Sequence, residues 1–306
     1  MRCEGSRPED RCAGIGDEAA ESITDQIAAI RALGWQRIEL RDIGGKALAD
    51  LGDAQVTDVA DELRDTGLSV VCLASRIGNW GRPVTAPFEH DLAELETLLD
   101  RCAVLNCRRV RVMSYPNDGL PPDEWAARVL DRLTRLARRA ERAGVILVHE
   151  NCAGWAGEDP ARMLRLVEQV ASPALRLLFD MGNGVPYGYD AYAVLERILP
   201  HVEHVHVKDA RRTPDGVRYV LPGEGEARVT DCLELLVRSG YPGTFSLEPH
   251  LAVRPHTGLY AYEDAADRFV SAGRRLHELV AECGAETVAH PQPQPQPQPQ
   301  PHGALR

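Results

Sequence analysis

The sequence has almost no lysine. Of its 35 basic residues only Lys46 and Lys208 are lysines, while 46 residues are acidic and the formal net charge is −11. No dense basic patch occurs along the chain, and neutralising a phosphate backbone requires clustered lysine and arginine. The composition therefore argues against a nucleic-acid partner and favours a small neutral or metal-bound substrate.

Signals for disulfide pairing and for membrane insertion are also missing. The eight cysteines are scattered without a CxxC pair, and the N-terminus shows no secretory apolar segment. We therefore expect reduced, structural thiols and a cytoplasmic location. No uninterrupted apolar run reaches 18 residues, so no membrane span is expected. The sequence leaves formation of a homo-oligomer open.

Short apolar runs rich in β-branched residues alternate with amphipathic segments of helical length. Ile23, Ile27 and Ile30 recur at spacings of four and three, which is typical of a helix, here ending near Gly34. Eight such pairs predict a (β/α)8 TIM barrel, with a doubly wound open sheet as the alternative. The expected strands are Arg11–Ile15, Arg37–Asp42, Ser69–Ala74, Arg109–Met113, Val145–His149, Leu175–Phe179, His204–Val207 and Thr244–Leu247.

The two ends of the chain are predicted to lie outside the barrel. Residues 1–10 are expected to form an N-terminal extension, and residues 11–289 the catalytic barrel. The repeated Pro-Gln pairs of residues 290–306 have nothing to bury and favour an extended, solvated conformation. We therefore predict a disordered tail there.

Acidic and histidine side chains follow four successive predicted strands. Glu150 comes after the fifth strand, Asp180 after the sixth, and Glu248 after the eighth, while the seventh contains His204 and His206. The carboxyl ends of barrel strands share one mouth, so these groups are expected to meet there. A single acidic residue in such a position is most often a helix cap, but four at equivalent points are hard to explain as caps.

Three carboxylates and one imidazole form a set that suits one divalent cation. Mn²⁺ is the favoured ion, with Mg²⁺, Co²⁺ and Zn²⁺ as alternatives, and the set lacks the thiolates of a structural zinc site. His204 and His206 lie two residues apart and so face the same side of the strand, with His206 nearer the mouth. We therefore assign His206 as the ligand and His204 as a packed or supporting imidazole.

Other residues near the strand ends are candidates for substrate binding. Lys208 and Arg212 follow the histidine ligand and are expected to reach the rim, although Arg212 can equally be a solvated loop cation. The remaining candidates are Asn183, His149 and Trp155, with Trp80 and Arg76 as further pocket walls. No glycine-rich phosphate cradle is visible, so the sequence does not demand a phosphorylated substrate. The loop LPGEGEARV at 221–229 is suited to cover the mouth.

The ordered set HENCAGW, FDMGN, HVHVKD, LPGEGEA and SLEPH resembles the xylose isomerase-like TIM-barrel superfamily. This group includes sugar phosphate isomerases and epimerases, ketose 3-epimerases, hydroxypyruvate isomerase and inosose dehydratase. The resemblance implies one divalent ion held by Glu150, Asp180, His206 and Glu248, and a role for Arg212 in binding substrate. Ketose 3-epimerases carry a histidine where this chain has Asn183, which argues against a free ketohexose as the substrate.

The resemblance and the residues together predict an epimerase or isomerase of a sugar, cyclitol or related polyol ketone. A cation that bridges the carbonyl and a neighbouring hydroxyl would stabilise the enediolate formed when the adjacent carbon loses its proton. Glu150 and Glu248 are the expected acid–base pair. Return of the proton to the opposite face gives epimerisation, and return to the neighbouring carbon gives isomerisation.

Three other functions compete with this prediction. A dehydratase could use the same bases to expel a β-hydroxyl. An abasic-site endonuclease, which the superfamily also contains, would need extra histidines at the ends of the second to fourth strands, and none occur there. A binding protein that kept the fold without the chemistry is disfavoured because all four candidate ligands are intact.

Overall fold

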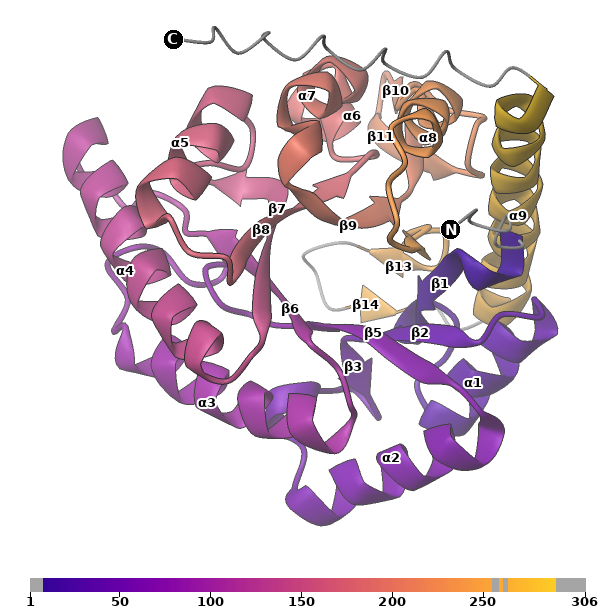
Figure 1. The fold of residues 1–306 in the computed structure, drawn as a ribbon, viewed down its shortest axis with the longest axis horizontal. Helices are drawn as coiled ribbons and strands as arrows, with labels where there is room; N and C mark the ends of the chain where they lie inside the picture. The colour runs from indigo at the N-terminus through magenta and orange to yellow at the C-terminus, as the bar shows by residue number, and fades with distance from the viewer. Residues whose placement is uncertain (1–7, 255–258, 261–263, 290–306) are drawn as a thin grey trace, which may run out of the picture.

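Eight parallel strands close into a barrel in this computed structural model, which describes residues 8–254, 259–260 and 264–289. The strands follow one another around the ring in the order β1-β12-β9-β8-β7-β6-β5-β2 (Figure 1). The predicted (β/α)8 barrel is confirmed. The barrel strands are β1 (Cys12–Ile15), β2 (Arg37–Leu40), β5 (Ser69–Ala74), β6 (Arg109–Ser114), β7 (Ile146–Gly154), β8 (Leu175–Asp180), β9 (Val202–Val207) and β12 (Phe245–Leu247).

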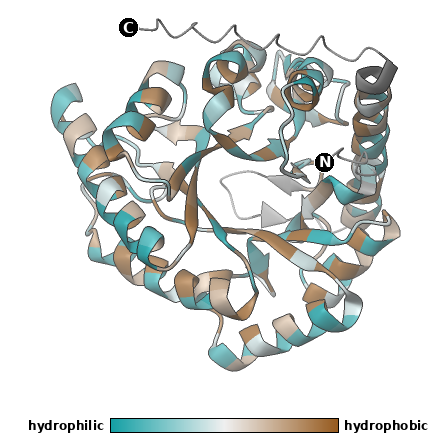
Figure 2. Cartoon of the chain, in the orientation of Figure 1, coloured by the Kyte–Doolittle hydropathy of each residue, from teal (hydrophilic) through white to brown (hydrophobic). Residues whose placement is uncertain are grey.

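Helices surround the ring of strands and cover its outer face (Figure 1). In α4 the buried residues recur at helical spacing, from Val129 through Leu133 and Leu136 to Ala140, so one face packs on the barrel. The strands are mostly brown and the helices carry both colours in Figure 2, as this packing requires. The helices are α1 (Ile23–Ala32), α2 (Asp53–Thr66), α3 (Glu89–Val104), α4 (Pro122–Arg142), α5 (Pro160–Val170), α6 (Gly184–Tyr187), α7 (Ala191–Ile198), α8 (Val229–Arg238) and α9 (Ala265–Ala289), with 3₁₀ turns at Pro8–Asp10, Gly16–Glu18, Leu48–Asp50 and Leu199–His201.

Three small antiparallel hairpins follow the carboxyl ends of barrel strands. They are β3 (Asp42–Ile43) with β4 (Lys46–Ala47), β10 (Asp209–Thr213) with β11 (Gly216–Val220), and β13 (Val253–Arg254) with β14 (Leu259–Tyr260). Because they follow β2, β9 and β12, all three belong to the loops of the barrel mouth. Two of them, β3–β4 and β10–β11, supply residues to the cavity described below.

All eight predicted strands are present, but the fifth is longer than expected. β7 continues to Gly154 because its far end still pairs with β6, with Ser114 opposite Gly154 after a shift in register. His149 and Glu150 therefore lie inside the strand. Since neighbouring residues of a strand point to opposite faces, these two side chains must diverge.

The inner face of the barrel changes from apolar to polar along its axis. A small apolar cluster contains only strand residues, namely Ala13, Val71, Cys72, Val148 and Leu178. Two residues further along β7 and β8, the side chains on the same face are Glu150 and Asp180, and both are buried. Filled barrels normally place branched apolar residues inside, so buried charge here marks the site.

The predicted chain ends lie largely outside the described residues. Of the expected extension 1–10 only residues 8–10 are described, and the whole Pro-Gln tail 290–306 falls beyond Ala289. The seven cysteines of the described part are all buried. None of the described helices combines the length and the apolar character needed to cross a membrane.

Candidate metal and active site

Four side chains meet at the mouth of the barrel. Glu150 lies on β7, Asp180 ends β8, His206 lies on β9 and Glu248 directly follows β12. All four are buried, and one ligand atom of each lies within 4.8 Å of the others. The structure thus brings together the four residues to which the strand ends pointed, here called the quartet.

His206 Nδ1 is a buried polar atom of the quartet that makes no hydrogen bond within the described part of the chain, whereas Asp180 Oδ2 pairs with the Lys208 ammonium at 2.8 Å. The imidazole Nδ1 lies 3.5 Å from Glu248 Oε2 and 3.9 Å from Asp180 Oδ2. Buried polar atoms in proteins almost always have a partner. Carboxylate oxygens with one imidazole are ligands that Mn²⁺, Mg²⁺ and Zn²⁺ accept. The donors of the quartet therefore fit a divalent cation.

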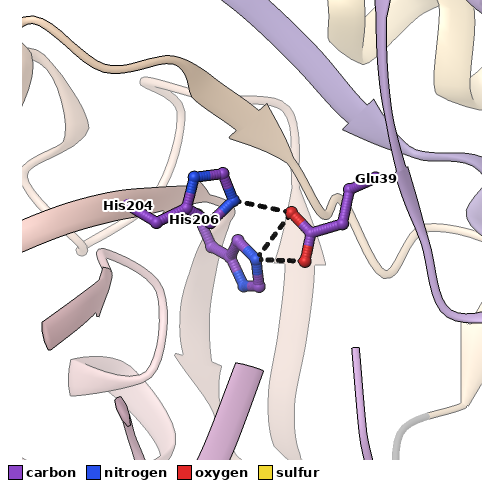
Figure 3. Close-up of side chains that lie close together, drawn as sticks. All are labelled: Glu39, His204 and His206. Carbon is purple, nitrogen blue, oxygen red and sulfur yellow. Dashed lines mark hydrogen bonds and ion pairs between the residues drawn. The ribbon is translucent and has the colours of Figure 1, made fainter. Parts of the chain in front are cut away.

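Glu39 on β2 holds the imidazole of the quartet from behind. Its carboxylate lies 3.0 Å and 3.1 Å from His206 Nε2, and 2.7 Å from His204 Nε2 (Figure 3). Ser246 donates a further hydrogen bond of 2.8 Å to Glu39. Burial alone would raise the pKa of Glu39, but the two imidazoles outweigh it and hold that pKa well below its usual value. Glu39 is therefore an ionised acceptor inside the barrel.

This contact fixes which nitrogen of His206 faces the quartet. Because an ionised carboxylate only accepts hydrogen bonds, Nε2 of His206 must carry a proton. The pKa of His206 lies well above its usual value, since Glu39 and Glu248 outweigh the effect of burial. A divalent cation would compete with the second proton for the lone pair on Nδ1. The arrangement matches the carboxylate–histidine pairs that orient metal ligands.

Lys208 reaches deeper than the rim position predicted for it. Its Nζ lies 2.8 Å from Asp180 Oδ2 and 3.1 Å from Glu248 Oε2, and its side chain is buried. Burial would lower the pKa of Lys208, but Asp180 and Glu248 hold it well above its usual value. The backbone of Lys208 packs closely against Gly182, where a Cβ would lie only 2.9 Å from the Lys208 carbonyl oxygen. Position 182 therefore needs glycine. Lys208 thus places a fixed ammonium beside the quartet.

Each glutamate of the quartet has its own arginine. Arg111 Nη1 donates to Glu150 Oε2 at 3.2 Å, and Arg41 Nη1 donates to Glu248 Oε1 at 2.8 Å. Arg41 also pairs with two buried carboxylates of the first strand loop. These bonds hold one oxygen of each glutamate, while the other oxygen accepts from Asn183 in Glu150 and from Lys208 in Glu248.

A cavity of about 770 Å³ opens above the quartet. Buried groups such as Glu150, Glu248 and Lys208 form its floor, while Lys46, Arg76 and the 43% exposed Trp80 lie at its mouth. Its size and its mixture of apolar and charged walls suit a small organic molecule. The further lining residues are Arg41, Asp42, Gly45, Ala47, Asp50, Ala74, Ser75, Asn79, Arg111, Met113, Cys152, Asn183, Pro186, Tyr187, Tyr219 and His250.

The structure does not bring all the predicted substrate contacts to this cavity. Asn183 lines it and donates to Glu150 Oε1 at 3.1 Å. Arg212 instead lies exposed on the β10–β11 hairpin, paired with Glu226, and is not among the lining residues. Trp155 packs in the core between barrel and helices. His149 is likewise directed away from the cavity, because its neighbour Glu150 faces inward.

His149 is an isolated imidazole in an apolar environment. It is fully buried, neither ring nitrogen makes a hydrogen bond to a described residue, and burial lowers its pKa to about 4. Removing a buried polar group that lacks a partner can leave stability unchanged or raise it. We therefore expect His149→Leu to keep the free energy of unfolding at pH 7, or to raise it by about 1 kcal/mol, in a denaturant titration.

Substrate binding gives the matching control for this variant. If His149 contacted the substrate, His149→Leu would raise KM, whereas an outward-facing side chain predicts an unchanged KM. A clear rise in KM with normal stability would contradict the placement of His149.

Sequence reasoning missed the charged residues deeper in the barrel. Glu39, Arg41 and Arg111 were not singled out, and His204 was expected only to pack or to support the ligand. A signal was present, because Glu39 in RIEL and Arg111 in RVRVM interrupt runs that are otherwise suited to burial. Their partners lie on other strands, so the sequence alone could not pair them.

The fold and the site define a parallel (β/α)8 barrel with a buried cluster of carboxylates and imidazole at its mouth. The family model described as "Xylose isomerase-like TIM barrel" matches residues 27–271. The chain belongs to this family, as the sequence motifs predicted.

The relatives include proteins that carry enzyme names. The chain is 32% identical over 229 residues to "2-epi-5-epi-valiolone 7-phosphate 2-epimerase" of an Actinoplanes species, covering 70% of this chain and 78% of that one. It is 28% identical over 141 residues to an inosose dehydratase of Bacillus thuringiensis, covering 41% of this chain. That match spans only 47% of the dehydratase, so the chain matches about half the length of this relative.

A solved structure shows the same fold. The crystal structure described as the IOLI protein with a bound zinc atom matches with a TM-score of 0.70 at 18% identity. The match covers 89% of this chain and 98% of the other. At this identity the likeness extends to the fold alone.

Proposed function

We propose that the protein is a metal-dependent epimerase or isomerase of a polyhydroxy ketone, such as a cyclitol ketone or a sugar. The proposal rests on the buried quartet, which includes two glutamates and lies beneath a cavity large enough for a small substrate. Glu150, Asp180, His206 and Glu248 would hold the cation, with Mn²⁺ as the proposed ion. When bound, the cation would supply the positive charge that stabilises the enediolate.

Glu150 and Glu248 would move the proton. They come from β7 and β12, which are separated in the ring by β8 and β9, so the two carboxylates approach the centre from different directions. One would take the proton from the carbon beside the carbonyl, and the other would return a proton from the far face. Burial would raise the pKa of Glu248, but Lys208 and the nearby imidazoles hold it well below its usual value, so Glu248 is present as a carboxylate.

The positions of Lys208, Arg41 and Arg111 support these roles. The Lys208 ammonium beside Asp180 and Glu248 is suited to donate a hydrogen bond to a substrate oxygen. Arg41 and Arg111 each hold one glutamate oxygen in place, which limits how far the two bases can turn. Buried, fixed groups of this kind are what proton transfer at carbon requires.

The names of the two relatives support the substrate class. A valiolone phosphate and an inosose are both cyclic polyhydroxy ketones, and the epimerase name describes inversion at one carbon. We propose a compound of the same chemical kind for this chain.

Dehydration is the second candidate, and the name of the inosose dehydratase favours it. The first step would be the same removal of a proton beside the carbonyl. The enediolate would then expel a β-hydroxyl, and Lys208 or the second glutamate would protonate the leaving oxygen. The two functions differ in whether water is lost.

Proton NMR in D₂O with a panel of ketoses, inososes and keto acids tests the proposal. An epimerase or isomerase should place deuterium at one carbon and form a product of unchanged composition, whereas a dehydratase should form an unsaturated or deoxy product. If no compound of the panel loses a carbon-bound proton in the presence of Mn²⁺-loaded protein, the proposed reaction is contradicted.

Glu39→Gln should weaken binding of the divalent cation by about 10- to 100-fold, the range typical of a lost contact behind a metal ligand. A neutral amide is a poorer acceptor for His206 Nε2–H, so the imidazole loses both its orientation and its negative partner. Competition with a fluorescent chelator measures the affinity without any turnover.

Glu94→Gln provides the matched control for Glu39→Gln. Glu94 is also a buried glutamate and is paired with Arg82 and with the Arg76 backbone N–H. It does not belong to the clusters of described acidic and histidine side chains that could hold a cation. This control should lose stability and keep its cation affinity. Equal affinity in the two variants would show that Glu39 does not position the histidine.

A further inference from the structure

The two lysines of the chain both line the same cavity. The other 33 of the 35 basic residues are arginines, so lysine is the exception in this protein. Lys208 belongs to the floor, beside the quartet, and Lys46 belongs to the mouth. The rare ammonium group thus occurs at both ends of the cavity.

Lys46 is presented on a short, anchored hairpin. The β3–β4 pair places Ile43 opposite Lys46, with Gly44 and Gly45 between them at φ values of +62° and +70°. Two central residues with positive φ are typical of a type I′ turn, for which glycine is favoured. The Gly44 N–H donates to the Glu21 carbonyl at 2.9 Å, which ties the turn to the body of the barrel. The backbone of Lys46 is therefore held at the mouth, and its side chain is exposed.

Lys46 differs from the other cationic side chains of the cavity in having no acidic partner among the described residues. Arg41, Arg111 and Lys208 are paired with glutamates or aspartates of the floor. At the mouth, Arg76 makes two hydrogen bonds of 2.7 Å to Asp50. The positive charge of Lys46 is therefore available to a ligand.

The choice of lysine over arginine has a physical reason here. Asp42 and Asp50 also line the cavity, and a guanidinium can bind a carboxylate through two parallel hydrogen bonds, as Arg76 does with Asp50. An ammonium is a strongly hydrated point charge on a flexible stem and pairs less firmly with such neighbours. Lysine therefore keeps its charge free at a place where arginine would be drawn to an aspartate.

We propose that Lys46 binds an anionic group of the substrate, a phosphate or a carboxylate, while the ketone end of the same molecule lies on the quartet. This assignment rests on the proposed function, in which the ketone reacts at the quartet. It adds that the substrate carries a negative charge, which the proposed reaction alone does not require. The exposed Trp80 lies at the same mouth and offers an apolar wall for the carbon chain between the two ends.

Binding of three matched ketoses tests the proposal. Fructose, fructose 6-phosphate and fructuronate share the ketone end and differ in a neutral, phosphate or carboxylate group at the sixth carbon. Calorimetric titration of the Mn²⁺-loaded protein should give tighter binding for at least one of the two anions than for fructose. Whichever anion binds more tightly identifies the group.

The variants isolate the charge of Lys46. Lys46→Gln should weaken binding of the preferred anion by about fivefold, the upper end for an exposed ion pair, and leave fructose unchanged. Lys46→Arg should lose part of the preference, because its guanidinium would be drawn to Asp42 or Asp50. Arg138→Gln, which removes an exposed cation on α4, should keep all of it. The preference should also shrink at high salt, because exposed charges are screened.

Several results would overturn the proposal. They are equal binding of fructose and both anions, no measurable binding of either anion, or an anion preference that survives in Lys46→Gln. Deuterium exchange with the wider panel of ketoses, inososes and keto acids reports separately on the floor. Anion preference without exchange would refute the proposed reaction alone, and exchange without anion preference would refute the role of Lys46 alone.

Discussion

Glu150→Gln and Glu248→Gln are each expected to lower turnover by about 10²- to 10⁴-fold, the usual contribution of general acid–base catalysis. A glutamine keeps only one carbonyl oxygen, and it can neither take nor give the proton. The hydrogen bonds from Arg111 and Arg41 can persist to the amide oxygen, so the barrel should remain folded.

Solvent deuterium incorporation separates the roles of the two glutamates. If one base serves each face of the carbon, the variant that keeps the base facing the substrate proton can still exchange it with D₂O without forming product. The other variant should lose both exchange and product formation. Wild-type rates of both in either variant would show that its glutamate is not a base, and the cation content of each variant should be measured alongside.

Asp180→Ala is expected to lose the divalent cation. Its affinity should fall further than the loss of about 10- to 100-fold that is typical when a residue supporting a metal ligand is removed. Asp180 is fully buried in the quartet, and its Oδ2 faces the same centre as the Lys208 ammonium, 2.8 Å away. Elemental analysis of the purified variant measures the loss directly.

Asp180→Asn is the companion variant, because Asp180 Oδ1 also accepts hydrogen bonds from the backbone N–H groups of Gly182 and Asn183, at 2.8 Å and 3.1 Å. The amide can keep these bonds and removes the charge. Weaker cation binding in both variants, with normal circular dichroism, would show that the loss comes from the missing carboxylate and not from unfolding. Full stoichiometric retention of the cation in Asp180→Ala would contradict the quartet as a metal site.

The sequence predicted the barrel well because its strands are short apolar runs at regular intervals. The rule that strand ends share one mouth then gathered Glu150, Asp180, His206 and Glu248, which the structure places together. That rule depends only on topology, so it needed no side-chain detail. Whether these residues hold a cation and move a proton remains a prediction.

Other parts of the site depend on which face a side chain takes and on contacts between distant strands. Side chains alternate between the two faces of β7, so an inward-facing Glu150 places His149 on the outer face, away from the substrate. The strand was expected to end at His149, so this alternation was not applied to the pair. Glu39 and His206 are 167 residues apart, and nothing near either one in the sequence indicates the other. Arg212 illustrates a different limit, since its position six residues after His206 does not reveal that it lies on the β10–β11 hairpin, away from the cavity.

The most direct test of the account is the cation dependence of proton exchange in the wild-type protein. Proton NMR in D₂O would follow one carbon-bound proton of a polyhydroxy ketone with native protein, after removal of divalent ions by a chelator, and after Mn²⁺ is added back. The account predicts exchange at a single carbon beside the carbonyl, its loss on chelation and its return with Mn²⁺. Exchange that continues at the same rate in the chelated protein would contradict the central claim.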